Sequence, residues 1–301
     1  MLALVAAVVL IVNPFASRVT VEKLAAVERE LSRAASVSVV MTQGPGHATE
    51  LVAEAMQNET DALVVFSGDG GFNEALNGLE GDVPVAFLPG GGTSVLPRAL
   101  GLPLDPVAAA RQVADAIEQH RTRRITVGRV NGRRFAFSAG LGVDAEAVRR
   151  VDDMGRAQDG RRPGDFAFAL AVVRTLAAHG GRLEPTLEVQ GLGRAACAFV
   201  ANAAPYTYAK RLPLRIAPEA DFELGLDLVA PVRVRRRSLV RTAYSVLRGR
   251  AGDDRLLYAH DLDRIEIACD GPTPLQADGE DLGDVEHAVF EAERGAVAVL
   301  V

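Results

Sequence analysis

The sequence predicts two domains, an α/β domain with a mostly parallel sheet followed by a mainly antiparallel β domain. The chain has 301 residues, a length that favours two domains with a core in each. Its first 120 residues alternate between strand-like and helix-like segments, which is typical of βαβ units. After residue 123 short strand-like segments dominate, and Asn131-Gly132 between two of them favours a hairpin with a type I′ turn.

Residues 1–123 are expected to form the α/β domain. The predicted strands are 6–12, 37–41, 62–66 and 83–88, and the predicted helices are 21–35, 48–57, 72–79 and 107–120. In open parallel sheets a ligand binds beyond the carboxyl ends of the strands. The loops 13–17, 67–73 and 89–94 leave strands at that edge, so we expect them to converge.

Residues 124–287 are expected to form the β domain. Its predicted strands are 124–130, 133–137, 186–190, 195–201, 226–229, 264–268 and 273–276, and its predicted helices are 165–178 and 238–248. The final apolar segment, 296–301, fits a strand of either domain. Residues 288–301 are therefore a candidate for completing the first domain.

Composition argues against nucleic acid as a partner, because the net charge is -6 and only 5% of residues are aromatic, which leaves few side chains for base stacking. Cys197 and Cys269 lie in apolar, strand-like surroundings without metal-type spacing, which favours buried packing and a reducing cytoplasm. The apolar residues 1–12 lack the basic start and cleavage site of a signal peptide and are too short to span a bilayer. We therefore expect a buried strand there and a cytoplasmic protein.

The most informative stretch is SGDGGFNEALNG at residues 67–78. It follows the apolar run 62–66, and from Phe72 its pattern is helical. This order of strand, glycine turn and helix places bare backbone N–H groups at a positive helix end, which favours phosphate binding. Asp69 lies inside the turn, where a carboxylate can accept a proton or bind a metal. A glycine turn alone is equally typical of an ordinary tight βα connection.

Two further loops and one acidic turn fit the same chemistry. Residues 13–17 (NPFAS) follow the first strand, 90–94 (GGGTS) follow the fourth, and Asp278-Gly279-Glu280 places two acids about a tight turn. Glycine-rich edges with isolated acids suit phosphoryl transfer, in which catalysis is mostly positioning, charge neutralisation and one base. Taken alone, the acidic turn is typical of a solvated loop, and Asn73 and Glu74 are typical of helix capping.

Taken in order, these motifs resemble those of the diacylglycerol kinase catalytic-domain family, which are soluble bacterial lipid kinases related to sphingosine kinases. Residues 13–17 resemble its Asn-Pro-x-Ser/Ala signature, and 67–78 resemble Gly-Gly-Asp-Gly-Thr-x-Asn-Glu-x-x-Asn-Gly. Residues 89–98 resemble its Pro-x-Gly-Thr-x-Asn-x-x-x-Arg loop. Residues 140–145 (GLGVDA) and 278–280 also follow the family's order, so the resemblance spans nearly the whole chain.

The resemblance implies a three-layer α/β domain like that of NAD kinase and phosphofructokinase, followed by an antiparallel β-sandwich domain. It implies transfer of the γ-phosphoryl group of ATP, with Mg²⁺, to the hydroxyl of diacylglycerol or a similar lipid alcohol. The nucleotide-binding residues that it implies are Asn13, Pro14, Phe15, Ala16, Ser17, Thr42, Ser67, Gly68, Asp69, Gly70, Gly71, Phe72, Asn73, Glu74, Gly91, Gly92, Thr93 and Ser94. The family's proton acceptor falls on Glu280, with Asp278 beside it. Asp69 is the alternative base, because relatives of the wider fold use the acid of the first glycine motif.

The sequence departs from the family's pattern in both domains. Gly71 and Gly92 stand where the family has threonine, and Ser94 stands where it has asparagine. In the second domain the family has an Asp-Gly pair that helps to hold a structural magnesium, whereas this chain has Leu224-Gly225. The candidate metal ligands are therefore Asp69 in the first domain and Glu223 or Asp227 as substitutes in the second.

A lipid acceptor requires access to a membrane. Seven arginines crowd residues 233–250, which favours transient docking to the anionic inner face of the membrane, although a solvated helix face would carry the same residues. Two other functions stay open, a soluble-substrate kinase of the NAD kinase type and a lipid-binding protein that has lost transfer. The sequence also leaves open whether the protein is a homodimer.

Overall fold

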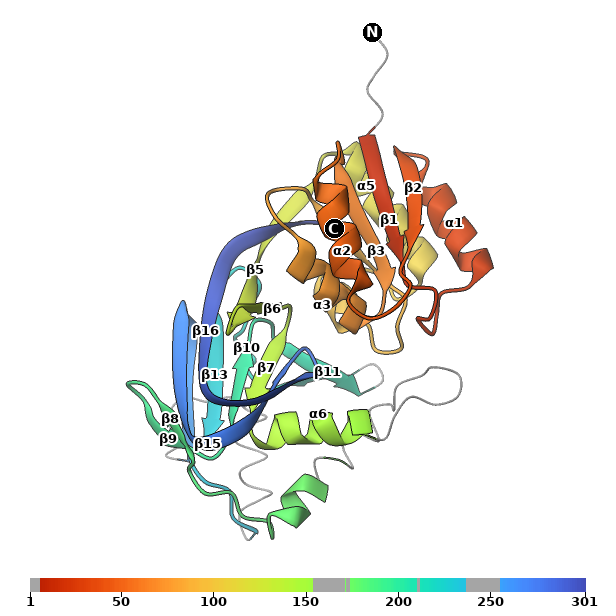
Figure 1. Ribbon diagram of the computed structural model, residues 1–301. Coiled ribbons are helices and arrows are strands. Elements are labelled where there is room, and N and C mark those ends of the chain that lie inside the picture. The colour runs from red at the N-terminus through yellow and green to blue at the C-terminus, as the bar shows by residue number, and fades with distance from the viewer. Residues whose placement is uncertain (1–5, 154–170, 172–173, 210–211, 237–254) are drawn as a thin grey trace. The chain divides into compact units, whose positions relative to one another are not determined.

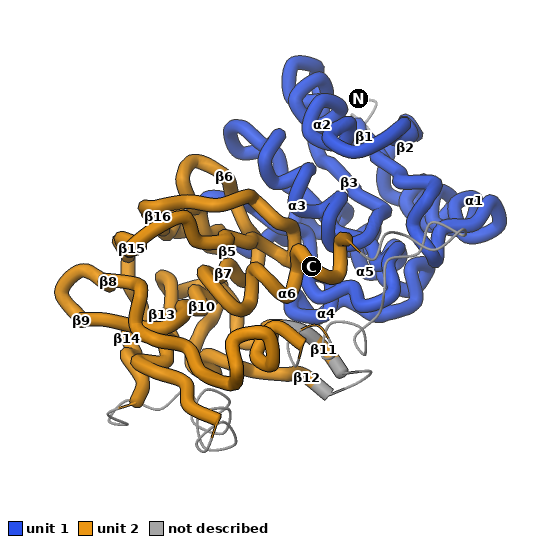
Figure 2. The backbone as a smooth tube through the Cα atoms, turned by 60° about the horizontal axis from the view of Figure 1, so that its bottom comes forward, with its two compact units in different colours: residues 1–125, 295–301 blue, residues 126–294 orange. Residues whose placement is uncertain are grey.

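The computed structural model describes residues 6–153, 171, 174–209, 212–236 and 255–301. The chain divides into two compact units, residues 1–125 with 295–301, and residues 126–294 (Figure 2). A separate hydrophobic core lies in each unit. Among the described residues, every helix is too short or too polar to cross a bilayer.

In the first unit, strands and helices alternate along the chain (Figure 1). They are β1 (Ala6–Val12), α1 (Val21–Leu31), β2 (Ala35–Met41), α2 (His47–Met56), β3 (Ala62–Ser67), α3 (Asp69–Gly78), β4 (Val85–Pro89), α4 (Val95–Ala99) and α5 (Pro106–Glu118). The strands lie parallel, as predicted, and their order in the sheet is β4-β3-β1-β2. Val299, near the C-terminus, pairs in parallel with Val85 on the other side of β4.

Helices cover both faces of this sheet, which gives the predicted three layers. On one face α1 and α5 pack against each other over alternate strand residues such as Leu10 and Val64. On the other face lie α2 and α3, where Phe72 packs edge to face on Phe87 with ring centroids 5.3 Å apart. Because both faces are covered, β3 is buried along its whole length, which explains its unbroken apolar sequence.

Two helix predictions in this unit are wrong at one end. The predicted helix 21–35 stops at Leu31, because Ser32 caps it and β2 already begins at Ala35. The predicted helix 72–79 begins earlier, at Asp69, with Gly68 as its N-cap. Asp69 to Gly71, expected in a loop, therefore form the first turn of α3, whose amides have no intrahelical acceptor. The short helix α4 is absent from the prediction.

The second unit is mainly antiparallel, as predicted. Its elements, some of which continue into the first unit, are β5 (Thr122–Val130), β6 (Arg133–Phe135), β7 (Ser138–Leu141), α6 (Val143–Asp153), β8 (Leu187–Val189), β9 (Gly193–Ala195), β10 (Ala198–Ala201), β11 (Pro205–Ala209), β12 (Leu212–Arg215), β13 (Leu226–Pro231), β14 (Leu256–Leu262), β15 (Arg264–Ala277) and β16 (Glu280–Leu300). Adjacent strands run antiparallel in the order β14-β13-β10-β7-β15-β16.

The predicted hairpin at the start of this unit is confirmed. Strands β5 and β6 pair antiparallel, with Val130 opposite Arg133. Asn131 has a φ of 47° and Gly132 a φ of 89°, and a type I′ turn requires this left-handed backbone at both central positions.

Other predicted elements of the second unit need correction. The predicted strand 195–201 is two strands, because β9 pairs with β8 whereas β10 pairs with β7 and β13. Conversely, 264–268 and 273–276 belong to one strand, β15, whose pairing with β16 is irregular between Ala268 and Thr273. The predicted helix 238–248 lies outside the described residues, as does most of 165–178, whose described end at 174–178 is helical.

Candidate active site

The three loops at the carboxyl edge of the first unit's sheet converge, as predicted. The Asn13 N–H donates to the Phe66 carbonyl oxygen at 3.0 Å, which ties the loop after β1 to the end of β3. The Gly90 N–H donates to the Ser67 carbonyl oxygen at 2.7 Å, and the Arg18 N–H donates to the Gly90 carbonyl oxygen at 2.8 Å. Backbone bonds alone therefore connect the ends of β1, β3 and β4.

Glycines allow two of these loops to touch through their backbones. A Cβ at Gly91 would lie 2.9 Å from the Gly68 α-carbon, and a Cβ at Gly90 would lie 2.8 Å from the Ser67 carbonyl oxygen. Neither distance leaves room for a side chain. The result is a cradle of bare backbone beside the N-terminus of α3, which is the arrangement that binds phosphate groups. The residues present thus fit a nucleotide phosphate.

Asp69 stands in the first turn of α3 and connects that helix to the next. Its Oδ1 accepts the Leu96 N–H of α4 at 3.2 Å, and the side chain is half-buried. A carboxylate at a helix N-terminus also gains from the positive helix dipole. Asp69 is therefore a carboxyl group held next to the backbone cradle.

Ser67 and Gly71 form a coupled pair at the same place. Ser67 is 2% exposed, and among the described residues its buried Oγ has no hydrogen-bond partner. A Cβ at Gly71 would lie 2.1 Å from that Oγ, so the serine hydroxyl occupies the space that a threonine at 71 would need. The motif that this stretch resembles has glycine and threonine at these two positions. This chain therefore has a hydroxyl at the end of β3, whereas the motif has one in the first turn of the following helix.

Several predicted nucleotide-binding side chains are used within the fold. Glu74 Oε2 accepts the Ala48 N–H at 3.2 Å and so caps α2, whose N-cap residue is a glycine. Asn73 is fully buried, and its Oδ1 accepts the Asn77 amide at 3.2 Å. Ser94 is buried with a φ of 51°, and its Oγ donates to the Gly91 carbonyl oxygen at 3.1 Å.

Other predicted residues lie at the surface of the same edge. Phe15 is 67% exposed, an unusual exposure for a large aromatic ring. Pro14, Ser17 and Gly92 are also exposed, and Asn13, Ala16, Gly70 and Thr93 are half-buried. Thr42 is 7% exposed, and its N–H donates to the Val12 carbonyl oxygen at 2.8 Å.

Sequence reasoning missed Arg18 at this edge. Its guanidinium donates to the Gly92 carbonyl oxygen at 3.0 Å and to the Leu104 carbonyl oxygen at 3.3 Å, and so holds the loop after β4. The only sequence signal is an arginine directly after the NPFAS loop. Its partners are carbonyl groups far along the chain, which no local pattern predicts.

In the second unit, Asp278-Gly279-Glu280 forms the hairpin turn between β15 and β16. Asp278 has a φ of 49° and Gly279 a φ of 79°, so both central residues are left-handed, as a type I′ turn requires. Asp278 is only 5% exposed, and its carboxylate accepts the N–H groups of Ala136 at 2.6 Å and Phe137 at 2.9 Å. The expectation of a tight turn is confirmed, but Asp278 is buried and bound to the backbone.

Glu280 begins β16 and has a more open setting. Its side chain is 31% exposed, and its Oε2 accepts the Arg133 Nη2 donor at 2.6 Å. The guanidinium of Arg133 therefore orients a partly exposed carboxylate at the start of the strand. Of the two acids of this turn, Glu280 is the more exposed.

A series of hydrogen bonds between side chains supports the turn at residues 278–279. The Gly279 N–H donates to Gln276 Oε1 at 2.9 Å, and Gln276 Nε2 donates to Asp144 Oδ2 at 2.6 Å. Tyr206 OH donates to the other oxygen of Asp144. Burial raises the pKa of Asp144 to about 6, against the lowering effect of these two donors. Asp144 thus bonds to side chains in the core, and sequence reasoning missed both Gln276 and Tyr206.

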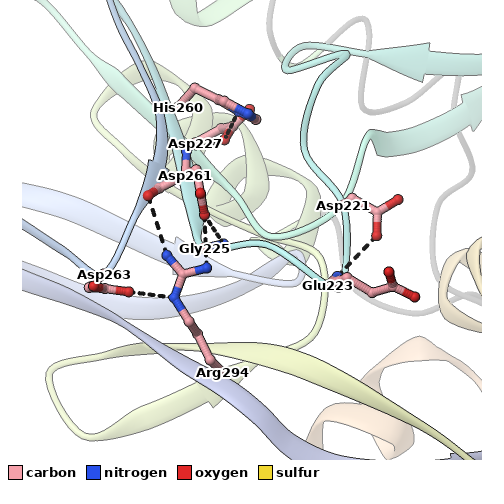
Figure 3. Close-up of polar contacts among 8 residues, drawn as sticks. All are labelled: Asp221, Glu223, Gly225, Asp227, His260, Asp261, Asp263 and Arg294. Atoms are coloured by element: carbon pink, nitrogen blue, oxygen red, sulfur yellow. Dashed lines mark hydrogen bonds and ion pairs between the residues drawn. The ribbon is translucent and has the colours of Figure 1, made fainter.

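The candidate metal ligands of the second unit do not form a cluster. Asp227 is fully buried and its Oδ1 lies 2.8 Å from His260 Nδ1, while the Glu223 side chain points elsewhere (Figure 3). Burial raises the pKa of Asp227, which opposes its charged form. Within the described ranges there is no group of three or more His, Cys, Asp or Glu side chains arranged to hold a metal ion.

Comparison with protein families matches both units. Residues 7–130 match the model described as the diacylglycerol kinase catalytic domain. Residues 137–301 match the model described as the YegS C-terminal NAD kinase beta sandwich-like domain. The second model covers more than half of the chain, and the two together leave few residues unmatched.

Individual relatives carry related descriptions. A "Probable lipid kinase YegS-like" of Pseudomonas fluorescens is 27% identical over 288 residues, which is 92% of this chain and 90% of that protein. A "Diacylglycerol kinase" of Mycobacterium tuberculosis is 36% identical over 124 residues, and a "Probable lipid kinase YegS-like" of Pseudomonas aeruginosa is 34% identical over 131 residues. In these two matches the chain spans only 39% and 41% of the relative's length.

A solved structure shows the same fold over the whole chain. The crystal structure of a diacylglycerol kinase from Bacillus anthracis str. Sterne superposes with a TM-score of 0.72 and 19% identity, covering 98% of this chain and 97% of that one.

Proposed function

Because the chain belongs to the diacylglycerol kinase catalytic-domain family, we propose that it is an ATP-dependent lipid kinase. The acceptor is the hydroxyl of diacylglycerol or a similar lipid alcohol. The observation that carries the proposal is the glycine-lined cradle at the ends of β3 and β4, where a side chain at Gly90 or Gly91 would clash with backbone beside the N-terminus of α3.

ATP binds, in this proposal, with its phosphates on the cradle formed by residues 67–71 and 90–92. The exposed ring of Phe15 contacts the nucleotide, and Arg18 holds the loop after β4 in position. Mg²⁺ would supply positive charge for the phosphate oxygens, and Asp69 is the carboxylate that we propose would hold it. Carboxylates and phosphate oxygens are the ligands that Mg²⁺ prefers.

Glu280 is the proposed general base. Its carboxylate takes the proton of the lipid hydroxyl while the hydroxyl oxygen bonds to the γ-phosphorus and the bond to the β,γ-bridging oxygen breaks, which releases ADP. Arg133 orients the Glu280 carboxylate, and Gln276 holds the turn through the Gly279 amide. Asp278 has a structural part in the same turn, because it binds the backbone at residues 136–138.

Transfer of label from γ-labelled ATP to a panel of lipid alcohols and NAD tests this function. Label in an organic-extractable product is the expected result. Label in NADP would replace the proposal by a soluble-substrate kinase of the NAD kinase type. A full lipid panel without transfer, for a protein that still binds lipid, would make it a lipid-binding protein.

We also propose transient docking to the anionic inner face of the membrane, supported by the basic residues 233–250. Of these, Arg233 lies 2.9 Å from Glu184, so it is partly offset, and residues 237–250 lie outside the described ranges. Co-sedimentation with anionic vesicles at low salt is expected, with release as salt rises. Equal recovery with neutral vesicles would contradict it.

A further inference from the structure

The structural magnesium that the family resemblance implies does not fit this chain. The family has an Asp-Gly pair at the position where this chain has Leu224-Gly225. Magnesium requires oxygen ligands in near-octahedral geometry, and a leucine side chain supplies none. The position contains a protein cation instead, because the Arg294 guanidinium lies beside Gly225 and between Asp261 and Asp263 (Figure 3).

Arg294 contacts the turn between β14 and β15 at three points. Its Nη1 lies 2.8 Å from Asp261 Oδ1, and its Nε donates to Asp263 Oδ1 at 2.5 Å. Its Nη2 donates to the Asp261 carbonyl oxygen at 3.3 Å. A guanidinium carries a fixed charge and several donors in one plane, so it can bind a set of oxygens that point toward a common centre.

The same turn is connected to the loop before β13 through Gly225. The Gly225 N–H donates to Asp261 Oδ1 at 2.7 Å, so one carboxylate oxygen binds both a backbone amide and the guanidinium. A Cβ at Gly225 would lie 2.5 Å from the Leu262 carbonyl oxygen and 2.7 Å from Arg294 Nη2. Only glycine permits this approach. Gly225 therefore serves a close contact here, although its neighbour in the sequence has lost the carboxylate.

Three acidic side chains, those of Asp227, Asp261 and Asp263, lie close together at this place. Asp227 is buried at the start of β13, and its Oδ1 accepts the Asp261 N–H at 3.0 Å. Asp261 itself has a φ of 58°, a left-handed conformation that a non-glycine residue adopts only when its surroundings hold it there. Without a positive charge, Asp261 and Asp263 would repel each other across this turn.

We propose that Arg294 replaces the family's structural magnesium as a cation supplied by the chain itself, and that through Asp261 it joins the loop before β13 to the β14–β15 turn. The second unit then needs no divalent ion for its stability. An arginine held by the covalent chain cannot be removed by a chelator, whereas a bound metal can. The proposal concerns the fold of the second unit and does not depend on kinase activity.

Thermal unfolding of the full chain without nucleotide tests the proposal. The melting temperature of the wild type is expected to be the same in EDTA and in excess Mg²⁺. Arg294→Ala is expected to melt about 3–8 °C lower, because it leaves the carboxylates of Asp261 and Asp263 without their common partner. Should that variant not fold, Arg294→Lys keeps the charge but loses the planar fork, and it is expected to melt below the control.

The control is Arg264→Ala, which removes a matched arginine from the same hairpin. Arg264 also bridges two carboxylates, Glu266 at 2.7 Å and Glu291 at 2.6 Å, and both of these partners belong to the β15–β16 hairpin itself. Its loss is expected to lower the melting temperature by less than about 2 °C. A wild type that loses stability in EDTA and regains it with Mg²⁺ would overturn the proposal. Equal melting of the Arg294 and Arg264 variants would do so as well.

Discussion

The candidate site residues of the first unit and those of the second unit are held in different ways. In the first unit the candidate site consists mainly of backbone, since Gly68, Gly90 and Gly91 let the loops after β3 and β4 touch without intervening side chains. In the second unit the site is a turn supported by side chains, with Asp278, Gln276 and Asp144 beneath a single partly exposed acid. The difference teaches that phosphate binding depends on positions that carry no side chain. Proton transfer depends on side chains that hold Glu280 in place.

The largest expected effect shows which residue is the general base, Glu280 of the second unit or Asp69 of the first. Glu280→Gln keeps an acceptor for Arg133 but removes the proton acceptor, so kcat is expected to fall about 10²–10⁴-fold at an unchanged melting temperature. Steady-state kinetics with lipid substrate measures this. Glu286→Gln makes the same chemical change at an exposed position of the same strand and serves as the control. If Glu280→Gln is nearly fully active while Asp69→Asn is inactive, the base belongs to the first unit.

A smaller effect tests the buried support of the turn through its pH dependence. Burial raises the pKa of Asp144 from 3.8 to about 6, so the folded state favours its protonated form. That stabilisation is full below the unfolded pKa and is lost as pH rises through 6, a change of about 3 kcal/mol. In Asp144→Asn, the free energy of unfolding should therefore decline less than in the wild type between pH 4 and 6, as measured with urea.

Glu146 on the same helix provides an internal comparison of opposite sign. Although burial opposes them, hydrogen bonds from His179 and Arg150 leave the pKa of Glu146 lowered. Its contribution is present above the unfolded pKa and is lost as pH falls, so Glu146→Gln should reduce stability at neutral pH and not at acid pH. Parallel pH profiles for the two variants would contradict the assignment of the raised pKa to Asp144.

The sequence predicts the backbone features of the first unit's candidate site better than the side-chain contacts of the second unit. The glycine loops, the alternating strands and the type I′ turns at Asn131 and Asp278 each have a local signal, because left-handed backbone and close approach restrict which residues are allowed. The burial of Asp278, the Gln276 support and the Arg294 contacts join residues far apart along the chain. No periodicity encodes such pairings, so only the folded structure reveals them.

Helix α6 depends both on a local sequence signal and on packing against distant residues. Its apolar residues Ala147 and Val151 are four apart and buried on one side, which is a helical signal. Charged residues lie between them, Gly142 directly precedes the helix, and none of the predicted helices includes these residues. The helix forms because tertiary packing buries its apolar side, and the same packing places Asp144 against Gln276.

The backbone site of the first unit can be tested by exchanging the residues of the Ser67–Gly71 pair. Gly71→Thr alone should cost about 1–3 kcal/mol of stability, since its Cβ would lie 2.1 Å from the Ser67 hydroxyl. Adding Ser67→Gly restores the arrangement of the motif that this stretch resembles and should recover most of that loss. A double-mutant cycle from urea unfolding measures the coupling. Gly92→Thr, at a position with no atom within 4 Å of the new Cβ, is the control, and additive effects at 67 and 71 would show that the pair is not coupled.

The smallest expected effect concerns Phe15, the exposed ring of the first unit. A side chain that is 67% exposed contributes little to the core, so Phe15→Ala should leave the melting temperature nearly unchanged. If the ring contacts the nucleotide, as we propose, the KM for ATP should rise about 3–10-fold, which corresponds to the loss of one aromatic contact. Val21→Ala, at another exposed apolar residue of this unit, separates a nucleotide contact from a general change of the surface. Unchanged KM in the Phe15 variant would confine nucleotide binding to the backbone cradle, and the contrast between a backbone site and a side-chain site would then be sharper still.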